Sequence, residues 1–122
     1  MSGIDFLVDT NFLIFVSDEN KIVLPFLEYD IAVSYITEME LLGVFSISKN
    51  QKLAMRKILN ECSIIECSIE IKELAIDLKQ KYKIKLPDAI IAATAISKKL
   101  PFVTADNDFK VIKELDLIFL ER

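Results

Sequence analysis

Five carboxylates stand just after apolar segments of this chain. Asp9 follows FLV, Glu40 lies just after SYIT, Asp88 follows KLP, and Asp106 and Asp108 follow FVT. A carboxylate withdrawn from water without a partner is costly, so this repetition predicts a cation that holds several of them together. Carboxylate oxygens suit Mg²⁺ or Mn²⁺, and the chain has no histidine to favour zinc or copper. The acids therefore predict a divalent metal site.

The segments that would position these acids alternate between two patterns. Short apolar runs typical of buried parallel strands occur at residues 4–8, 31–36, 63–67, 101–104 and 117–120. Helical patterns occur at 11–17, 21–28, 37–47, 49–61, 69–83, 87–99 and 107–114. The alternation predicts an α/β fold in which helices cover both faces of a parallel sheet. Right-handed crossovers bring the carboxyl ends of the strands to one edge, and Asp9 and Asp106 fall there.

Length and composition indicate one domain over residues 1–122. A chain of 122 residues and 13.9 kDa has single-domain size, and its two glycines and three prolines mark no linker. Hydrophobic residues make up 52% of the chain, yet no uncharged apolar run approaches the ~20 residues of a membrane span. The first residues carry no basic segment of the kind that opens a signal peptide. We therefore expect a soluble, cytoplasmic protein.

Charge is distributed unevenly along the chain. The net charge of −4 argues against a nucleic-acid partner, but residues 1–48 carry −7 and residues 49–122 carry +3. The densest basic patch, Lys79, Lys81, Lys83 and Lys85, leads directly to Asp88. Two interpretations stay open for this patch. It is either a solvated helix end, where lysines favour the negative pole of the helix dipole, or a basic surface beside an acidic centre.

Two cysteines, Cys62 and Cys67, offer no metal-binding pattern. They lie five positions apart, without CxxC spacing and without a histidine in the chain. We interpret both as small buried hydrophobic residues and not as ligands or a disulfide.

Most of the acids also have a simpler structural interpretation. Asp9 precedes NFLIFV and suits a helix N-cap, as does Asp106 with Asp108 in the following turn. Asp88 directly follows Pro87, which is typical of a helix start. The uncharged run AIIAATAIS after Asp88 nevertheless indicates a helix covered on most sides, which would place this carboxylate near the interior.

Glu40 has its own alternative. The spacing of Thr37, Glu40 and Gly43 puts them on one helix face, with Glu38 pointing away. Thr37 and Glu40 would form a capping box if Thr37 opened the helix. Gly43 on the same face predicts a close approach to neighbouring backbone, which disfavours a solvated glutamate there.

Four motifs follow one another along the chain: VDTN at 8–11, SYITEMELLG at 34–43, LPDAIIAATAI at 86–96 and VTADNDF at 103–109. Together and in this order they resemble the PIN-domain ribonucleases, and most closely the VapC-type toxins of prokaryotic toxin–antitoxin pairs. By this resemblance Asp9, Glu40, Asp88 and Asp106 match the four acidic positions of the family, and Asp108 matches a further one.

The resemblance also implies the following properties. Asn11, Thr37 and Thr104 match polar positions that support the site. The implied fold is a three-layer α/β/α sandwich around a short parallel sheet. The implied activity is Mg²⁺- or Mn²⁺-dependent cleavage of RNA, with homodimers and a cognate antitoxin as frequent partners. One departure is Ala105, where many relatives have a basic residue.

The residue types agree with such chemistry. One or two metal ions can activate a water and neutralise the charge that develops on a phosphodiester, without a histidine. We expect Asp9, Asp88 and Asp106 to be direct or water-bridged ligands, with Asp108 as a further ligand. Glu40 would bind a second metal or position the attacking water. Lysines close to the acids, Lys83 and Lys85, would contact RNA phosphates.

Rival interpretations come from other classes of protein. A receiver domain has a similar length and sheet, but such domains have an adjacent acidic pair after the first strand and a phospho-accepting aspartate near the middle. Here VDTN has one acid, and residues 49–60 have none. A haloacid-dehalogenase-type phosphatase would have an aspartate where Asn11 stands. A catalytically idle PIN-like domain that only binds RNA or protein stays open.

One apolar surface is also expected. The helix AIIAATAIS, together with Phe12, Phe15 and Phe26, would form a face for self-association or for an antitoxin, unless these residues are simply core.

Overall fold

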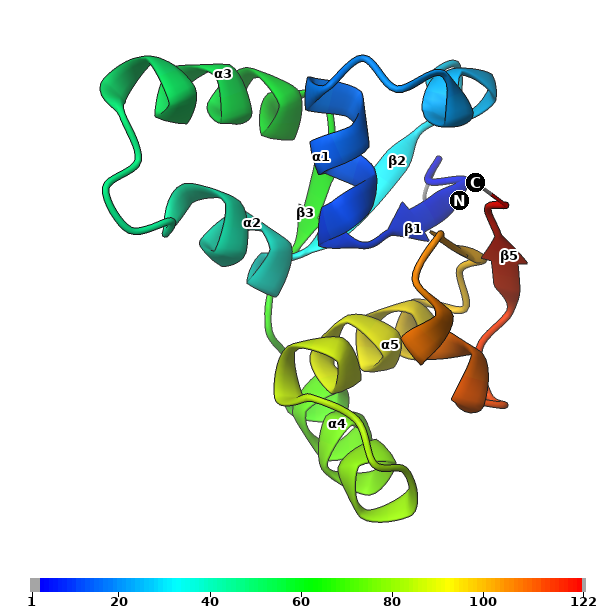
Figure 1. The fold of residues 1–122 in the computed structure, drawn as a ribbon. Helices are drawn as coiled ribbons and strands as arrows, with labels where there is room; N and C mark the ends of the chain where they lie inside the picture. The colour runs from blue at the N-terminus through cyan, green and yellow to red at the C-terminus, as the bar shows by residue number, and fades with distance from the viewer. Residues whose placement is uncertain (1–2, 122) are drawn as a thin grey trace.

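Five parallel strands form one sheet in the order β3-β2-β1-β4-β5 in a computed structural model, which describes residues 3–121 (Figure 1). The strands are β1 (Phe6–Val8), β2 (Ile31–Ser34), β3 (Ser63–Ile65), β4 (Phe102–Thr104) and β5 (Leu117–Phe119). All five predicted strands are present, although each is one or two residues shorter than predicted. The central strand β1 pairs with both β2 and β4, so the carboxyl ends of these three strands meet.

Helices connect the strands and cover both faces of the sheet. The α-helices are α1 (Thr10–Ser17), α2 (Tyr35–Leu42), α3 (Lys49–Asn60), α4 (Ile69–Lys81) and α5 (Leu86–Lys98). Figure 1 shows α1 and α3 on one side of the sheet and α4 with α5 on the other. Within residues 3–121, none of these helices combines the length and the apolar character that a bilayer crossing requires.

Neighbouring residues of β1 pack into different helical layers, because side chains alternate along a strand. Leu7 belongs to an apolar cluster with Ala92 of α5, and Val8 belongs to a second cluster with Phe12 and Leu59. All five side chains are almost completely buried, and burial of a side chain the size of leucine contributes ~1.5–3 kcal/mol. The predicted three-layer α/β/α fold is therefore confirmed.

Helix α2 begins earlier than predicted. The Ser34 hydroxyl accepts a hydrogen bond from the backbone N–H of Ile36 at 3.1 Å and caps the helix, so β2 ends at Ser34 and not at residue 36. Thr37 is inside the helix and completely buried. The alternative interpretation of Thr37 and Glu40 as a capping box is therefore wrong, and both side chains are available for other contacts.

Gly43 ends α2 for a local reason. Its backbone N–H bonds to the carbonyl of Met39 at 2.8 Å, and a Cβ at position 43 would lie 2.5 Å from that same oxygen. The crowding comes from the last turn of its own helix. The predicted close approach of another backbone segment is therefore wrong.

Two of the predicted helices are short 3-10 turns. They are η1 (Lys21–Phe26), predicted at 21–28, and η2 (Asn107–Val111), predicted at 107–114. Pro25 inside η1 has no N–H for a helical hydrogen bond, which disfavours a regular α-helix. The Asp106 side chain caps η2 by accepting from the N–H of Asp108 at 2.9 Å. Such a bond two residues ahead favours a tight turn over an α-helix.

The two cysteines differ in their surroundings. Cys62 is half-buried, and burial, with a smaller contribution from Glu61, raises the pKa of its thiol to about 11. Cys62 thus behaves as the predicted small hydrophobic residue. Cys67 is exposed, so its predicted burial is wrong, because β3 ends at Ile65 and leaves Cys67 in the connection to α4. Neither thiol is in a disulfide.

The predicted apolar face does not exist as described. Five residues of α5 between Ala89 and Ala95 are buried in the cluster with α4, and Phe12 is buried under the other layer. Phe15 and Phe26 are half-buried and pack against that second cluster. These residues are core, which was the alternative interpretation.

Candidate active site

Asp9 lies where β1 ends and α1 begins. It is the N-cap of α1, since its Oδ1 accepts a hydrogen bond from the N–H of Phe12 at 2.9 Å. Its Oδ2 accepts from the Thr104 hydroxyl at 2.5 Å. Only 3% of Asp9 is exposed, and this burial raises the pKa of its carboxyl, with Asp106 adding to the effect and the two hydrogen bonds opposing it. The cap and the site interpretations are thus compatible.

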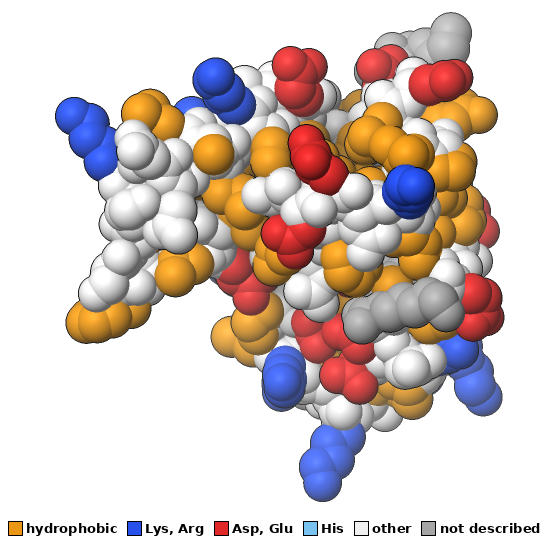
Figure 2. All heavy atoms as spheres, turned by 45° about the horizontal axis from the view of Figure 1, so that its top comes forward, with side chains coloured by type: hydrophobic (Ala, Val, Ile, Leu, Met, Phe, Trp, Pro, Cys, Tyr) orange, Lys and Arg blue, Asp and Glu red, His pale blue; other side chains and the backbone are white. Residues whose placement is uncertain are grey.

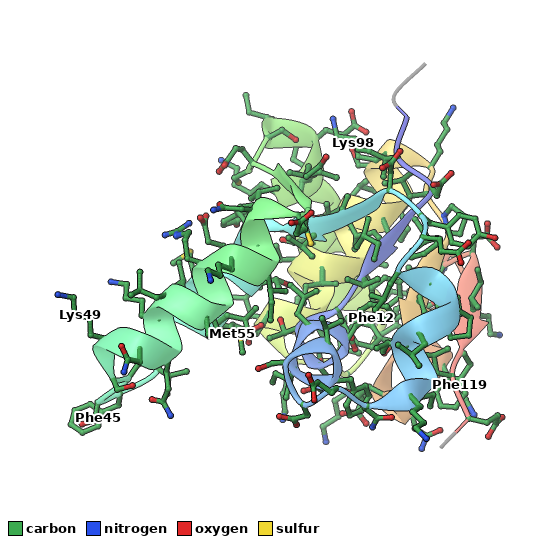
Figure 3. All side chains as sticks on the ribbon, turned by 90° about the horizontal axis from the view of Figure 1, so that it is seen from above. Phe12, Phe45, Lys49, Met55, Lys98 and Phe119 are labelled. Atoms are coloured by element: carbon green, nitrogen blue, oxygen red, sulfur yellow. The ribbon has the colours of Figure 1, made fainter. Side chains whose placement is uncertain are left out.

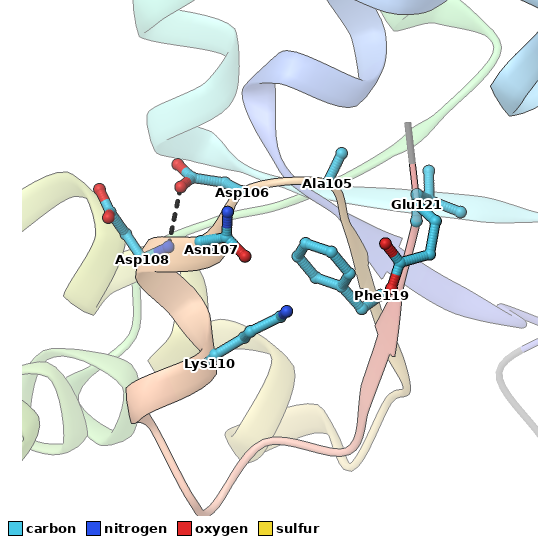
Figure 4. A pocket seen from close by; sticks show the side chains of 8 residues that line it. Ala105, Asp106, Asn107, Asp108, Lys110, Phe119 and Glu121 are labelled. Atoms are coloured by element: carbon cyan, nitrogen blue, oxygen red, sulfur yellow. Dashed lines mark hydrogen bonds between the residues drawn. The ribbon is translucent and has the colours of Figure 1, made fainter.

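Thr104, at the end of β4, links Asp9 to the next acids. While its hydroxyl donates to Asp9, its Oγ1 accepts from the backbone N–H of Asp106 at 3.0 Å. Asp106 in turn caps η2 through the N–H of Asp108. In Figure 4 the carboxylates of Asp106 and Asp108 extend to the same side of η2. The expected supporting role of Thr104 corresponds here to a double hydrogen bond between two strand ends.

A chain of hydroxyl groups holds Glu40. Thr10 donates to Glu40 Oε1 at 2.5 Å, and the hydroxyls of Thr10 and Thr37 lie 3.0 Å apart. Because Thr10 has one hydroxyl proton and gives it to Glu40, Thr37 must donate to Thr10. The first turn of α1 thereby fixes a carboxylate on α2. Glu38, as predicted, points away and forms an ion pair with Arg56 of α3 at 2.9 Å.

Asp88 occupies the first turn of α5 without capping it. The N-cap position is Lys85, which makes no side-chain capping bond, and Pro87 stands in the first turn. The capping interpretation of Asp88 is therefore wrong. Burial raises the pKa of Asp88 to about 6, and repulsion from Asp106, Asp108 and Glu40 adds to the rise, while Lys85 lowers it.

The five predicted acids therefore share one electrostatic environment. Asp106 is close enough to raise the pKa of both Asp9 and Asp88, and Asp108 and Glu40 also act on Asp88. These acids come from the ends of β1 and β4, from α2 and from the start of α5. In Figure 2 acidic side chains gather below the centre of the face, with lysine or arginine side chains around its edge.

This donor set fits a hydrated divalent ion. Within residues 3–121, no three acidic or cysteine side chains are placed to enclose an ion by themselves. Mg²⁺ usually keeps several waters and uses only one or two carboxylates directly. A cation beside Asp88 would favour the charged carboxylate and so oppose the burial and repulsion that raise its pKa. The chemistry of the residues thus agrees with a site of few direct ligands.

The basic patch divides into two pairs. Lys79 donates to the carbonyl of Ile84 at 2.8 Å, and Lys81 forms an ion pair with Glu114 at 2.8 Å. In the described chain Lys83 and Lys85 have no ion pair, and both line a pocket together with Asp88. The helix-end interpretation therefore suits the first pair, and a basic surface beside the acids suits the second.

Three supporting residues have different surroundings. Thr37 and Thr104 are buried and bonded, as described above. Asn11 is exposed, and no hydrogen bond of its side chain occurs within residues 3–121, so its supporting role stays a prediction. The hydrogen bond that links this turn to Glu40 is made by its neighbour Thr10. The sequence offers only one signal for Thr10, its position directly after Asp9.

Comparison with known proteins identifies the family. The PIN domain family model matches residues 6–115. This chain therefore belongs to the PIN domain family, whose members are generally nucleases. A search of curated proteins found no significant match.

Solved structures agree with this assignment. A toxin–antitoxin complex from Klebsiella pneumoniae is similar with 35% identity and a TM-score of 0.79, over 93% of this chain and 96% of that one. VapBC2 from Rickettsia felis, bound to a DNA fragment from its promoter, is 26% identical with a TM-score of 0.81, over 97% and 100%. DNA-bound VapBC from Salmonella typhimurium shares the fold, with 18% identity and a TM-score of 0.82, over 95% and 98%. The resemblance to VapC-type toxins is confirmed.

Proposed function

We propose that residues 1–122 form one PIN-like nuclease domain that cuts cytoplasmic RNA with Mg²⁺ or Mn²⁺, as the toxin of a toxin–antitoxin pair. The observation that carries this proposal is the half-buried Asp88, whose pKa is raised to about 6 beside Asp106, Asp108 and Glu40. Carboxylates are seldom concentrated this way without a cation to offset their repulsion.

Each residue has a specific role in this proposal. Asp9, Asp88 and Asp106 bind the metal ion, directly or through water. Asp108 is a further ligand. When bound, the metal supplies charge neutralisation at the phosphate and lowers the pKa of a bound water. Glu40, oriented by Thr10, binds a second ion or accepts the proton of the attacking water.

RNA must reach an acidic centre in this proposal. Lys83 and Lys85 line the same pocket as Asp88, and their ammonium groups are available for phosphates. Their position lets a polyanion approach the acids from a side where positive charge comes first. The domain as a whole need not be basic for this, because only the local potential decides the approach.

The proposal is tested by cleavage of defined RNAs. The purified protein should cut single-stranded or structured RNA at low salt with Mg²⁺ or Mn²⁺, and a chelator should stop the reaction. Asp9→Asn and Asp106→Asn should each reduce the rate by orders of magnitude, whereas Asp77→Asn, an exposed charge change on α4, should not. Cleavage that persists with a chelator and in Asp9→Asn would indicate a contaminating nuclease.

Protein partners belong to the same proposal. The relatives named above are toxin–antitoxin complexes, which supports a cognate antitoxin here. A homodimer is the other partner in this proposal. The arm formed by α2 and α3 carries exposed apolar side chains at its outer part, with Phe45 94% exposed and Val44 exposed beside it. A large exposed phenylalanine is a natural contact for a partner chain. Sedimentation at micromolar concentration should therefore give a species above 14 kDa, and Phe45→Ser should weaken it.

A catalytically idle binding domain is the second candidate. Its supporting observation is that, in residues 3–121, no three ligand side chains are placed to enclose an ion. This candidate predicts RNA or protein binding without cleavage under any metal. Consistent inactivity across Mg²⁺, Mn²⁺ and several RNAs would favour it.

A further inference from the structure

A pocket with a different lining adjoins the acids on the β5 side. It has a volume of about 490 Å³, within the range typical of ligand sites. One side of the pocket is formed by two of the acids, Asp106 and Asp108, with Asn107 between them. The far side is formed by Lys110 of η2 and Phe119 of β5. Figure 4 shows the Phe119 ring pointing into this pocket, with the ammonium of Lys110 directed toward it. Neither Phe119 nor Lys110 has a role in the nuclease reaction proposed above.

We propose that this pocket holds one base of the RNA, stacked on Phe119, next to the phosphate positioned at the acids. The inference rests on the proposed function and adds the place of a neighbouring nucleotide. An aromatic ring beside a lysine is the usual combination in single-strand binding sites, where the ring stacks on the base and the amine contacts the backbone.

The contact between Lys110 and Phe119 covers the face of the ring on which a base would stack. The Lys110 amine lies 3.9 Å from the centre of the Phe119 ring. An exposed cation–π contact is weaker than the stacking of a base on an aromatic ring, and the freed amine gains a phosphate. Exchange of the amine for a base is therefore favourable. Lys110 protects the ring from water until the RNA arrives.

The pocket is continuous with the surface that carries the other lysines. Asn107 and Asp108 line both this pocket and the one formed with Lys83 and Lys85. A strand of RNA can therefore run from Lys85 past Asp108 to Phe119. This path places positive charge on both sides of the acids.

The polar groups of the pocket can bind the edge of a base. Glu121 offers only acceptors, whereas the amide of Asn107 offers a donor and an acceptor. The exocyclic amines of adenine, cytosine and guanine and the N3–H of uracil can all donate to this carboxylate. The pocket therefore accepts any base and holds it chiefly by stacking on Phe119.

The test uses single-stranded RNA with one 2-aminopurine, bound to protein carrying Asp9→Asn so that the strand stays intact. Stacking on Phe119 should quench the fluorescence of the modified base. Phe119→Leu should abolish this quenching and weaken binding by about tenfold, whereas Phe119→Trp should keep both. Lys110→Gln should also weaken binding and reduce its dependence on salt.

Tyr29→Leu is the matched control, because Tyr29 is an exposed ring just before β2, at the amino ends of the strands and away from the acids. Tyr29→Leu should change neither quenching nor affinity. Melting temperatures of all variants show whether each one is folded. If Phe119→Leu misfolds, Lys110→Gln, at an exposed position, still decides the phosphate contact, and Phe119→Trp still decides the stacking.

Several results would overturn the inference. One is equal binding and quenching in Phe119→Leu and Tyr29→Leu. Another is a loss in Phe119→Trp as large as in Phe119→Leu, since that would make the effect structural. If the wild type cleaves RNA but these variants cleave it equally well, the base pocket is wrong and the proposed function stands. A wild type that neither binds nor cleaves RNA removes both.

Discussion

The hydroxyl of Thr104 donates a hydrogen bond of 2.5 Å to Asp9 Oδ2, although the two residues are 95 positions apart in the chain. Parallel pairing of β1 with β4 brings their carboxyl ends together and makes this contact geometrically available. The same hydroxyl oxygen accepts from the N–H of Asp106 at 3.0 Å. One side chain thus fixes two of the acids relative to each other.

Thr104→Val should lower the free energy of unfolding at pH 7 by about 1–3 kcal/mol, because it leaves a buried carboxylate oxygen and a backbone N–H without this partner. Thr104→Ser keeps the hydroxyl and should lose much less. Urea denaturation measures both changes. The loss should shrink in acid, because a protonated Asp9 tolerates the apolar neighbour better.

Thr94→Val is the control for this prediction. Thr94 is equally buried, but its hydroxyl donates to an uncharged acceptor, the backbone carbonyl of Ile90 inside α5. Its replacement should cost less than that of Thr104. Equal costs at the two positions would show that the bond to Asp9 has no special importance.

Asp88 should make stability depend on pH in an unusual direction. Its folded pKa of about 6 lies above its ordinary value, so the folded protein binds a proton more tightly than the unfolded chain does. Stability from this residue is therefore highest in acid and falls as the pH rises through the interval between 3.8 and about 6. Without metal, Asp88→Asn should raise the melting temperature at pH 8 and have little effect near pH 4. An equal effect at both pH values would contradict the raised pKa.

Divalent cations should stabilise the wild-type protein. A cation bound only by the folded state raises the melting temperature by mass action, and it also offsets the repulsion among the acids. Mg²⁺ or Mn²⁺ should therefore raise the melting temperature of the wild type, and Asp88→Asn should show a smaller rise. Asp77→Asn removes the same charge from an exposed position of α4 and should respond like the wild type. Identical rises in all three proteins would exclude Asp88 as a ligand.

Replacing Lys83 and Lys85 by alanine should weaken RNA binding and reduce its dependence on salt, while the metal-induced rise in melting temperature stays. Each lysine that contacts a phosphate of a single strand contributes ~0.7 to the slope of log affinity against log salt. The double variant should lose up to about twice that value. Fluorescence anisotropy at several salt concentrations measures the slope.

The pair Lys49 and Lys52 on α3 provides the matched control for this measurement. Both are exposed, and Figure 3 shows Lys49 near Phe45, on the opposite side of the molecule from Phe119. Alanine at both positions removes the same charge from the chain. If this control reduced the slope as much as the Lys83 and Lys85 variant, binding would depend on net charge and not on a path beside the acids.

The sequence by itself determined the order and type of most elements, because apolar periodicity is local. The runs around Val8 and Val103 are fully buried strands, and the uncharged segment after Asp88 is a core helix. The five acids could be selected for the same reason, since each one ends or follows an apolar run. Turn chemistry was harder to predict, and the serine that starts α2 competed with a threonine three positions later that suits a cap equally well.

Only the tertiary structure decided which polar groups form hydrogen bonds with one another and which charges interact. The link from Thr37 through Thr10 to Glu40 joins two helices that no periodicity relates. Likewise, the raised pKa of Asp88 follows from burial and from the acids of other elements brought beside it. Local pattern fixes a side chain's face on its own helix or strand, whereas its partners depend on how distant segments pack, and hydrogen bonds and pKa values are set by those partners.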